Sequence, residues 1–320
     1  MRRLARQIVR VMIAALALCS LSPVQAQPAS PPEEIRFEEE AIVEVTINGV
    51  PARLEVQPGL AGPPILNRAI IRQLVLPNPS ERSIDFGSRL LPGYLAKAVI
   101  DFGYGEEQTK VAWSPLEASS KADGVIGVHD LPYRLVTFQL AETSASETLQ
   151  RFKLKRRRGN NFTRLGTQIK VARKKLFLIF ALHLEPNVVT ASTANFLATH
   201  LEGGFVADSD ASVDLVFGVR VPTRDMRLVY PVEFGALDLD RFAVRVLDHG
   251  RPDMVGEIDA DDPRFTEDGS ILVSRRKPTG KPDLLTRVGR SQIAHCSRLT
   301  FDLEEMEGQL SCDAGKLAQR

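Results

Sequence analysis

The chain has 320 residues, of which 43% are hydrophobic and 25% are charged, and its formal net charge is +1. This near-balance of charge gives no global signal for binding nucleic acid or an anionic membrane. The length is sufficient to bury two hydrophobic cores, so we expect two domains of ordinary size.

The first 26 residues have the pattern of a secretory signal peptide. Four arginines precede the short apolar run VMIAALALCSL, and Val24-Gln25-Ala26 forms a small-x-small cleavage site. This run is too short for a transmembrane helix, and no later segment is apolar for long enough to cross a bilayer. Lipoprotein processing at Cys19 is the alternative, but Leu18 stands where a small residue is required. We expect a periplasmic or secreted protein, cleaved after Ala26.

Removal of this leader changes both the charge and the cysteine content. The mature chain keeps 37 of the 41 Lys and Arg against 40 Asp and Glu, which makes it slightly acidic. Cys296 and Cys312 remain, and an even pair in an exported chain predicts a disulfide. They flank an alternating strand, an acidic turn ending in Gly308 and a return strand, so we expect a bridge between the last two strands. Residues 27–40 are polar and begin with a Pro-rich stretch, which predicts a disordered tether.

The first half of the mature chain is rich in strand patterns. Val43, Val45 and Ile47 alternate, an Asn-Gly turn follows, and Leu54 and Val56 continue the pattern in a return strand. A short helix is expected after the prolines in AGPPILNRAIIRQL. KAVIDFGYGEEQTKVAW reads as a strand, a Gly-rich turn around Asp101 and a second strand. DGVIGVHDLPYRLVTFQL reads as an apolar run, a turn and an alternating strand.

The second half repeats this plan in the same order. TQIKVARKKLFLIFALHLEPNVVTASTANFL matches the opening hairpin at an offset of 124 residues, and both hairpins are followed by a predicted helix. DLLTRVGRSQIAHCSRLTFDLEEMEGQLSC then matches the segment that closes the first half. Two matches in the same order indicate a duplicated unit.

A basic segment joins the two halves at residues 144–162. Its cations Lys153, Lys155, Arg156, Arg157 and Arg158 repel one another, and Gly159-Asn160-Asn161 disfavours regular structure. We expect a solvated linker here. A docking patch for an acidic partner or an anionic surface is the alternative.

The duplicated pattern resembles the retropepsin-like aspartic protease family in a two-lobed, single-chain form. The matching pieces are VEVTINGVPARLEV, PILNRAIIRQL, ADGVIGVHDL, VVTASTANFL and DLLTRVG. The resemblance implies an all-β fold of two small β-barrel lobes with short helices and a cleft between the lobes. It places the N-terminal lobe at residues 41–143, the C-terminal lobe at 163–313 and a tail at 314–320.

The loops that carry the two catalytic aspartates in that family are degenerate in this chain. Where the family pattern reads Asp-Thr-Gly-Ala, the first half has Gln57-Pro58-Gly59-Leu60 and the second has Ala181-Leu182-His183-Leu184. An aspartic dyad requires two carboxyl groups that share a proton. Gln57 can hydrogen-bond a water but cannot take its proton, and Ala181 can do neither. No catalytic residue of the family's usual kind is therefore expected at Gln57, Gly59, Ala181 or His183.

Asp85 is the remaining candidate for a displaced catalytic acid. It begins Asp85-Phe86-Gly87-Ser88, which is similar to an active loop, but only Ile84 supports a strand before it and no helix pattern follows. A β-turn in which Asp and Gly hold their ordinary turn roles is favoured.

No other motif predicts catalysis, a cofactor or a metal site. The chain lacks G-x-S-x-G, H-E-x-x-H, G-x-x-x-x-G-K and C-x-x-C patterns. Its five histidines are widely spaced, and only His183 lies in a degenerate loop, where a packed or capping role is favoured.

Three hypotheses follow. The first is an exported, catalytically inactive binding protein that holds an extended peptide or a protein partner in its cleft through backbone hydrogen bonds. The second is an active aspartyl endopeptidase that uses Asp85. The third is a structural scaffold of the cell envelope. The sequence identifies neither the partner nor the oligomeric state, and fold alone does not supply function.

Overall fold

The protein is mostly β-structure. The computed structural model describes residues 30–85, 90–158, 163–215, 218–246 and 284–313. Residues 31–320 form one compact unit. The signal peptide expected at residues 1–26 and the tail expected at 314–320 lie outside the described residues. No helix among the described residues is long and apolar enough to cross a membrane.

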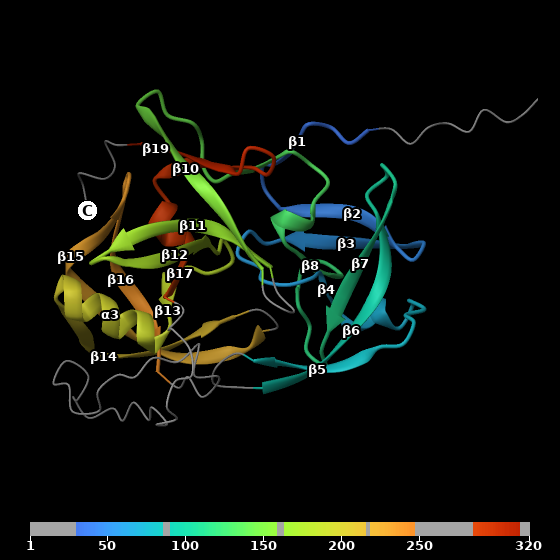
Figure 1. Cartoon of the computed structure of the whole chain (residues 1–320), viewed down its shortest axis with the longest axis horizontal. Coiled ribbons are helices and arrows are strands. Elements are labelled where there is room, and N and C mark those ends of the chain that lie inside the picture. Colours follow the sequence, from blue (N-terminus) through green and yellow to red (C-terminus); the bar gives the residue numbers. More distant parts are fainter. Residues whose placement is uncertain (1–29, 86–89, 159–162, 216–217, 247–283, 314–320) are drawn as a thin grey trace, which may run out of the picture. The chain divides into compact units, whose positions relative to one another are not determined.

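The first half folds into a seven-stranded sheet that closes on itself (Figure 1). Six of its strands form a barrel because the first strand also pairs with the sixth in order, and the seventh extends the edge. In sheet order the strands are β2 (Ile42–Ile47), β3 (Val50–Val56), β8 (Gly124–Ile126), β4 (Ile65–Leu66), β7 (Glu106–Trp113), β6 (Leu90–Asp101) and β5 (Ser80–Asp85). The alternation of β2 and β3 sends Val43, Val45 and Leu54 into the core, as the sequence predicts.

The second half contributes most of a twelve-stranded sheet. In order its strands are β1 (Glu34–Phe37), β9 (Leu135–Gln139), β18 (Cys296–Asp302), β19 (Glu307–Asp313), β10 (Glu147–Arg158), β11 (Thr163–Val171), β12 (Lys174–Phe180), β17 (Leu285–Val288), β13 (Val188–Val189), β16 (Leu237–Arg245), β15 (Arg220–Phe234) and β14 (Gly203–Asp214). The sheet joins the two halves because β9, from the first half, pairs with β18, from the second. This pairing explains why residues 31–320 behave as one unit.

The two halves have the same topology around one crossing strand. In the first half β8 lies between β3, which it pairs in parallel, and β4, which it pairs antiparallel. In the second half β17 lies between β12 and β13 with the same two orientations. A helix follows the short strand in each case: α2 (Arg68–Ile71) after β4 and α3 (Ala191–Leu201) after β13. The structure thus confirms the internal repeat that the sequence predicts.

Helix α3 begins with a side-chain cap. Thr190 has an extended backbone, and its hydroxyl accepts a hydrogen bond from the backbone N–H of Thr193 at 3.3 Å. This contact satisfies one of the N–H groups that the first turn leaves unpaired. Phe196 and Leu197 then face the core.

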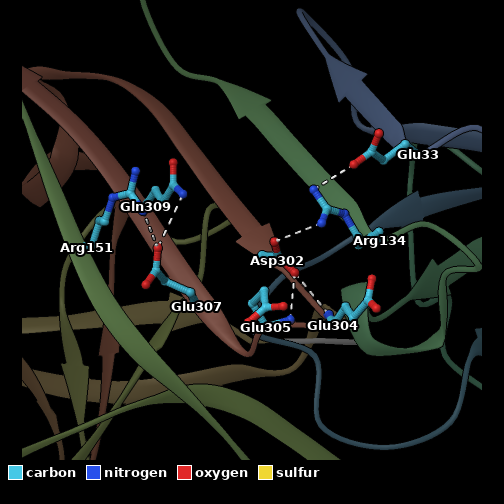
Figure 2. Close-up of polar contacts among 8 residues, drawn as sticks. All are labelled: Glu33, Arg134, Arg151, Asp302, Glu304, Glu305, Glu307 and Gln309. Carbon is cyan, nitrogen blue, oxygen red and sulfur yellow. Dashed lines mark hydrogen bonds and ion pairs between the residues drawn. The ribbon is translucent and has the colours of Figure 1, made fainter.

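The predicted disulfide is present. Cys296 and Cys312 are bonded, lie directly opposite each other in β18 and β19, and have Cα atoms 3.8 Å apart. Both are fully buried. The bridge therefore closes the hairpin at the end opposite its turn. Asp302 accepts hydrogen bonds from the backbone N–H groups of Glu304 and Glu305 within that turn, as Figure 2 shows.

The prediction of a disordered tether over residues 27–40 is wrong for residues 34–37. These residues form β1, which pairs in parallel with β9. Phe37 is buried, and the centroid of its ring lies 5.4 Å from the ring centroid of Phe138. Figure 2 shows Arg134 between Glu33, at 2.6 Å, and Asp302, at 4.0 Å. Burial of an aromatic ring stabilises a strand far more than exposed ion pairs do, so Phe37 anchors this segment.

The prediction of an irregular linker over residues 144–162 is wrong for residues 147–158. Residues 147–158 form β10, a twelve-residue strand that pairs antiparallel with both β19 and β11. Its pattern alternates, so that Phe152 and Leu154 are buried while Lys153 and Lys155 are exposed. Alternate burial places Lys153 and Lys155 on the solvent side of the sheet, where water screens their repulsion.

We expect Phe152→Ala to destabilise the protein by about 3–5 kcal/mol. The Phe152 ring lies 5.7 Å from that of Phe180 and 5.3 Å from that of Phe234, so truncation would leave a cavity in the core. The neighbouring exposed residue provides the control, and Lys153→Ala should change the free energy of unfolding by no more than about 0.5 kcal/mol. Urea denaturation measures both, and equal, small effects would show that β10 is not a core strand.

Candidate functional site

The site is built from two loops that occupy the same position in the two halves. Gln57 follows β3, and its backbone N–H donates to the carbonyl of Ile126, at the end of β8, at 2.9 Å. Ala181 follows β12, and its N–H donates to the carbonyl of Val288, at the end of β17, also at 2.9 Å. Gln57 and Ala181 are therefore structural equivalents, as the sequence repeat predicts.

Each loop then turns back on itself in the same way. The N–H of Leu60 donates to the carbonyl of Gln57 at 3.0 Å, and the N–H of Leu184 donates to the carbonyl of Ala181 at 2.9 Å. The two turns also touch. A Cβ atom added to Gly59 would lie 2.9 Å from the carbonyl oxygen of Phe180 and 3.2 Å from the Cβ of Ala181. Only glycine fits at this close approach of the two loops.

A cavity of about 640 Å³ lies against both loops. Gln57 and Pro58 line it from the first half, and Leu182 and His183 line it from the second. Segment 116–121 supplies a further part of the wall. A larger cavity, of about 790 Å³, is lined by residues of the second half alone and receives neither loop. The smaller cavity is therefore the candidate site.

Gln57 is the most informative residue in this cavity. Only 6% of its surface is exposed, and its amide Nε2 donates to the carboxylate of Glu55 at 3.3 Å. Its Oε1 is buried and has no hydrogen-bond partner. A buried acceptor without a partner costs about 1–3 kcal/mol, so this atom is available to a hydrogen-bond donor from a ligand or from water.

Glu55 is a functional candidate that sequence reasoning missed. Besides Gln57, its carboxylate accepts a hydrogen bond from the hydroxyl of Ser119 at 2.6 Å. Ser119 is held by Asn67, whose amide donates to the Ser119 carbonyl at 2.7 Å and whose Oδ1 accepts from the N–H of Ala118 at 2.6 Å. The contacts join residues more than 50 positions apart, so only the fold reveals them.

His183 lines the same cavity, and burial lowers its pKa to about 4, with a further lowering by the nearby Arg287. Its Nδ1 has no hydrogen-bond partner. The imidazole is therefore neutral at physiological pH and can accept or donate one hydrogen bond at that atom, depending on the tautomer. Ala181, at the start of the same loop, is fully buried and offers no polar side-chain atom.

Asp85 and Asp101 are the last residues of strands β5 and β6. Asp85 is the last residue of β5, at the outer edge of the seven-stranded sheet, where its backbone pairs with Leu90. Its side chain lies outside the described part of the structure. Asp101 has the turn role expected from the sequence, since its carboxylate accepts from the N–H groups of Gly103 and Gly105.

A second group of titratable residues lines a cavity of about 120 Å³ beside Pro64 and Ile126. His129 and Asp130 belong to the short helix η1 (Val128–Asp130), and the His129 Nε2 lies 3.4 Å from the Asp130 carboxylate. Burial lowers the pKa of His129 to about 4, an effect that Arg156 reinforces and the Gly62 carbonyl opposes. Burial also raises the pKa of Asp130 to about 7, with a further increase from Glu107 and an opposing effect from Arg156.

One group of metal-type ligands occurs among the described residues. His295 lies beside Cys296 and Cys312, with the ligand atoms within 4.8 Å of one another. The two sulfurs are bonded to each other, so they are not thiolates and cannot serve as metal ligands in this state.

Comparison with known proteins adds little to this picture. No known protein family and no curated protein matches the chain. Among solved structures, the chain is similar to the EIAV protease complexed with the inhibitor HBY-793, with 13% sequence identity and a TM-score of 0.24. The similarity covers 28% of this chain and 82% of that one. At a TM-score this low, the similarity carries no weight for the fold or the function of this chain.

We expect His183→Asn to gain stability relative to the wild type as pH falls from 6.5 to 4. The pKa of His183 is depressed in the native state, so the unfolded chain takes up a proton first as pH falls. The contribution of neutral His183 to the free energy of unfolding is therefore full above about pH 6.5 and is lost as pH falls toward 4. Each pH unit across this window corresponds to about 1.4 kcal/mol, so the relative gain should reach about 2–3 kcal/mol.

Asp130→Asn provides the matched variant with the opposite sign. The pKa of Asp130 is raised in the native state, so its contribution is full below about pH 4 and is lost as pH rises through 7. The free energy of unfolding of this variant should therefore rise relative to that of the wild type as pH rises, by about 2–4 kcal/mol at pH 7.5. Urea denaturation at intervals from pH 4 to 7.5 measures both, and parallel pH profiles for all three proteins would contradict the assignments.

Proposed function

We propose that this protein is an exported, catalytically inactive relative of the two-lobed aspartic proteases that binds an extended peptide or a segment of a partner protein. The duplicated crossing-strand topology supports the retropepsin-like assignment of residues 41–143 and 163–313. The occupant lies in the 640 Å³ cavity, against the loops that begin at Gln57 and Ala181. The signal-peptide pattern of residues 1–26 supports a location in the periplasm or outside the cell.

The unpartnered Oε1 of Gln57 carries the proposal. It is a buried acceptor on the wall of a cavity large enough for a ligand, and the N–H groups of an extended peptide are the donors that such an acceptor pairs with. The unpartnered His183 Nδ1, from the second half, adds another polar atom to the same wall. A peptide bound here would contact both halves at once.

Hydrolysis by a shared-proton carboxyl pair has no support at these positions. Gln57 stands where the first carboxyl group would be, and it cannot take a proton from water. Ala181 stands where the second would be, in direct contact with the first loop.

Gln57→Leu tests the binding role. Removing a buried, unpartnered acceptor should leave stability unchanged or raise it by about 1 kcal/mol, while binding should weaken by about tenfold or more. The assay is affinity selection of a pool of random, capped decapeptides on the full-length exported protein, with urea denaturation as the stability measurement. A Gln57 that serves only the fold would give the reverse result: lower stability and unchanged peptide recovery. Failure of any peptide to be retained by the wild type would refute the proposed function.

Proteolysis provides the second test. The protein should not cleave an unfolded substrate between pH 3 and 5, and pepstatin should change nothing, because neither loop offers a carboxyl group. Acid-optimal cleavage that persists through repurification and disappears in Asp85→Asn would establish the endopeptidase alternative instead.

A further inference from the structure

The charged residues around the cavity are strongly unbalanced. Five carboxylates and two cations line it: Glu39, Glu40, Glu55, Glu117, Glu185, Lys121 and Arg290. None of these seven forms an ion pair within the described part of the chain. Glu55 is the one carboxylate that is partly buried rather than exposed. Solvent screens the four exposed carboxylates, so Glu55 dominates the field inside the cavity.

The polar atoms beside Glu55 are acceptors that need a donor. The Gln57 Nε2 already donates to Glu55, which leaves the buried Gln57 Oε1 as an unused acceptor. Ser119 likewise uses its hydroxyl proton on the Glu55 carboxylate. The Ser119 hydroxyl and one N–H of the Gln57 amide therefore donate to Glu55, and the Glu55 carboxylate and the Gln57 Oε1 offer accepting capacity at this part of the wall.

A group that carries several N–H donors, no acceptor and a positive charge matches this wall. The ammonium of lysine and the guanidinium of arginine have these properties, whereas amide or hydroxyl side chains bring acceptors of their own. The Gln57 Oε1 has two lone pairs, so it can accept from a basic side chain and from a backbone N–H of the same peptide. We propose that the cavity selects peptides carrying a basic side chain, which donates to the Glu55 carboxylate and to the Gln57 Oε1. This inference rests on the proposed peptide-binding function and specifies the ligand class for the same site.

Peptide pools with one fixed position test this selectivity. Each pool contains decapeptides with capped ends and random uncharged residues, except for a fixed central lysine, norleucine or glutamate. The lysine pool should bind the full-length protein about tenfold or more tightly than the norleucine pool, and the glutamate pool should bind weakest. Raising the salt concentration from 50 to 500 mM should reduce the preference for lysine.

Glu55→Gln is the diagnostic variant, since its amide can still accept the Ser119 hydrogen bond. It should bind the lysine and norleucine pools equally. Glu44→Gln is the matched control, because Glu44 lies on the adjacent strand β2 but is exposed and does not line the cavity. This control should keep the full preference for lysine. Thermal melting verifies that both variants fold, and the salt dependence of the wild type supplies a test that needs no variant.

The outcomes separate the two proposals. Equal binding of the lysine and norleucine pools by the wild type would overturn the basic-ligand inference and leave peptide binding intact. Retention of no pool would overturn peptide binding itself, and the inference with it. A divalent metal ion is another source of positive charge, so calorimetry with Ca²⁺ alone provides a separate arm. Ca²⁺ binding that Glu55→Gln abolishes, without any preference for lysine, would assign the carboxylate to a metal ion and would also overturn the inference.

Discussion

The fold and the site both depend on the parallel pairing of β3 with β8 and of β12 with β17. Each pairing ends in a hydrogen bond from the first loop residue to the crossing strand, from Gln57 to Ile126 and from Ala181 to Val288. These bonds fix where each strand stops and the loop turns. Because the same constraint acts twice, the two loops meet at Gly59, and the cavity forms beside that contact.

Much of this framework is predictable from the sequence because it depends on local alternation and on a repeat. The hairpin of β2 and β3, the helices after β4 and β13 and the Cys296–Cys312 bridge all have local signals. The equivalence of Gln57 and Ala181 follows from the 124-residue offset between the two halves. These features are predictable because the hydrophobic periodicity of a strand or helix, and the residues that favour a turn, can each be recognised within a short stretch of sequence.

The errors have a common physical cause. The cations from Lys153 to Arg158 predict a linker over residues 144–162, but Phe152 and Leu154 alternate with the exposed residues, and residues 147–158 form a strand. The partners of this strand are β11 and β19, and β19 is distant in sequence, since Glu147 pairs with Asp313. In the same way, Glu55 and Ser119 meet only because Asn67 holds segment 116–121 against the first loop. Contacts between residues that are distant in sequence can outweigh the local propensity of a segment. Such contacts leave no pattern in the neighbouring sequence from which they could be predicted.

The site offers binding capacity without a carboxyl pair. Neither Gln57 nor Ala181 carries a carboxyl group, yet the two turns approach each other at Gly59 and a cavity lies beside them. The Gln57 Oε1 is a buried acceptor with no hydrogen-bond partner, which costs about 1–3 kcal/mol. The binding role that we propose gives this atom a partner.

Amide hydrogen exchange, measured with and without a peptide recovered from the random pool, tests the central claim most directly. The account predicts that the bound peptide slows exchange in both loops, at residues 57–60 and 181–184, and in segment 116–121, while β14 and β15 exchange as in the free protein. Slowed exchange confined to β14 and β15, or to one loop without the other, would contradict a binding site shared by the two halves.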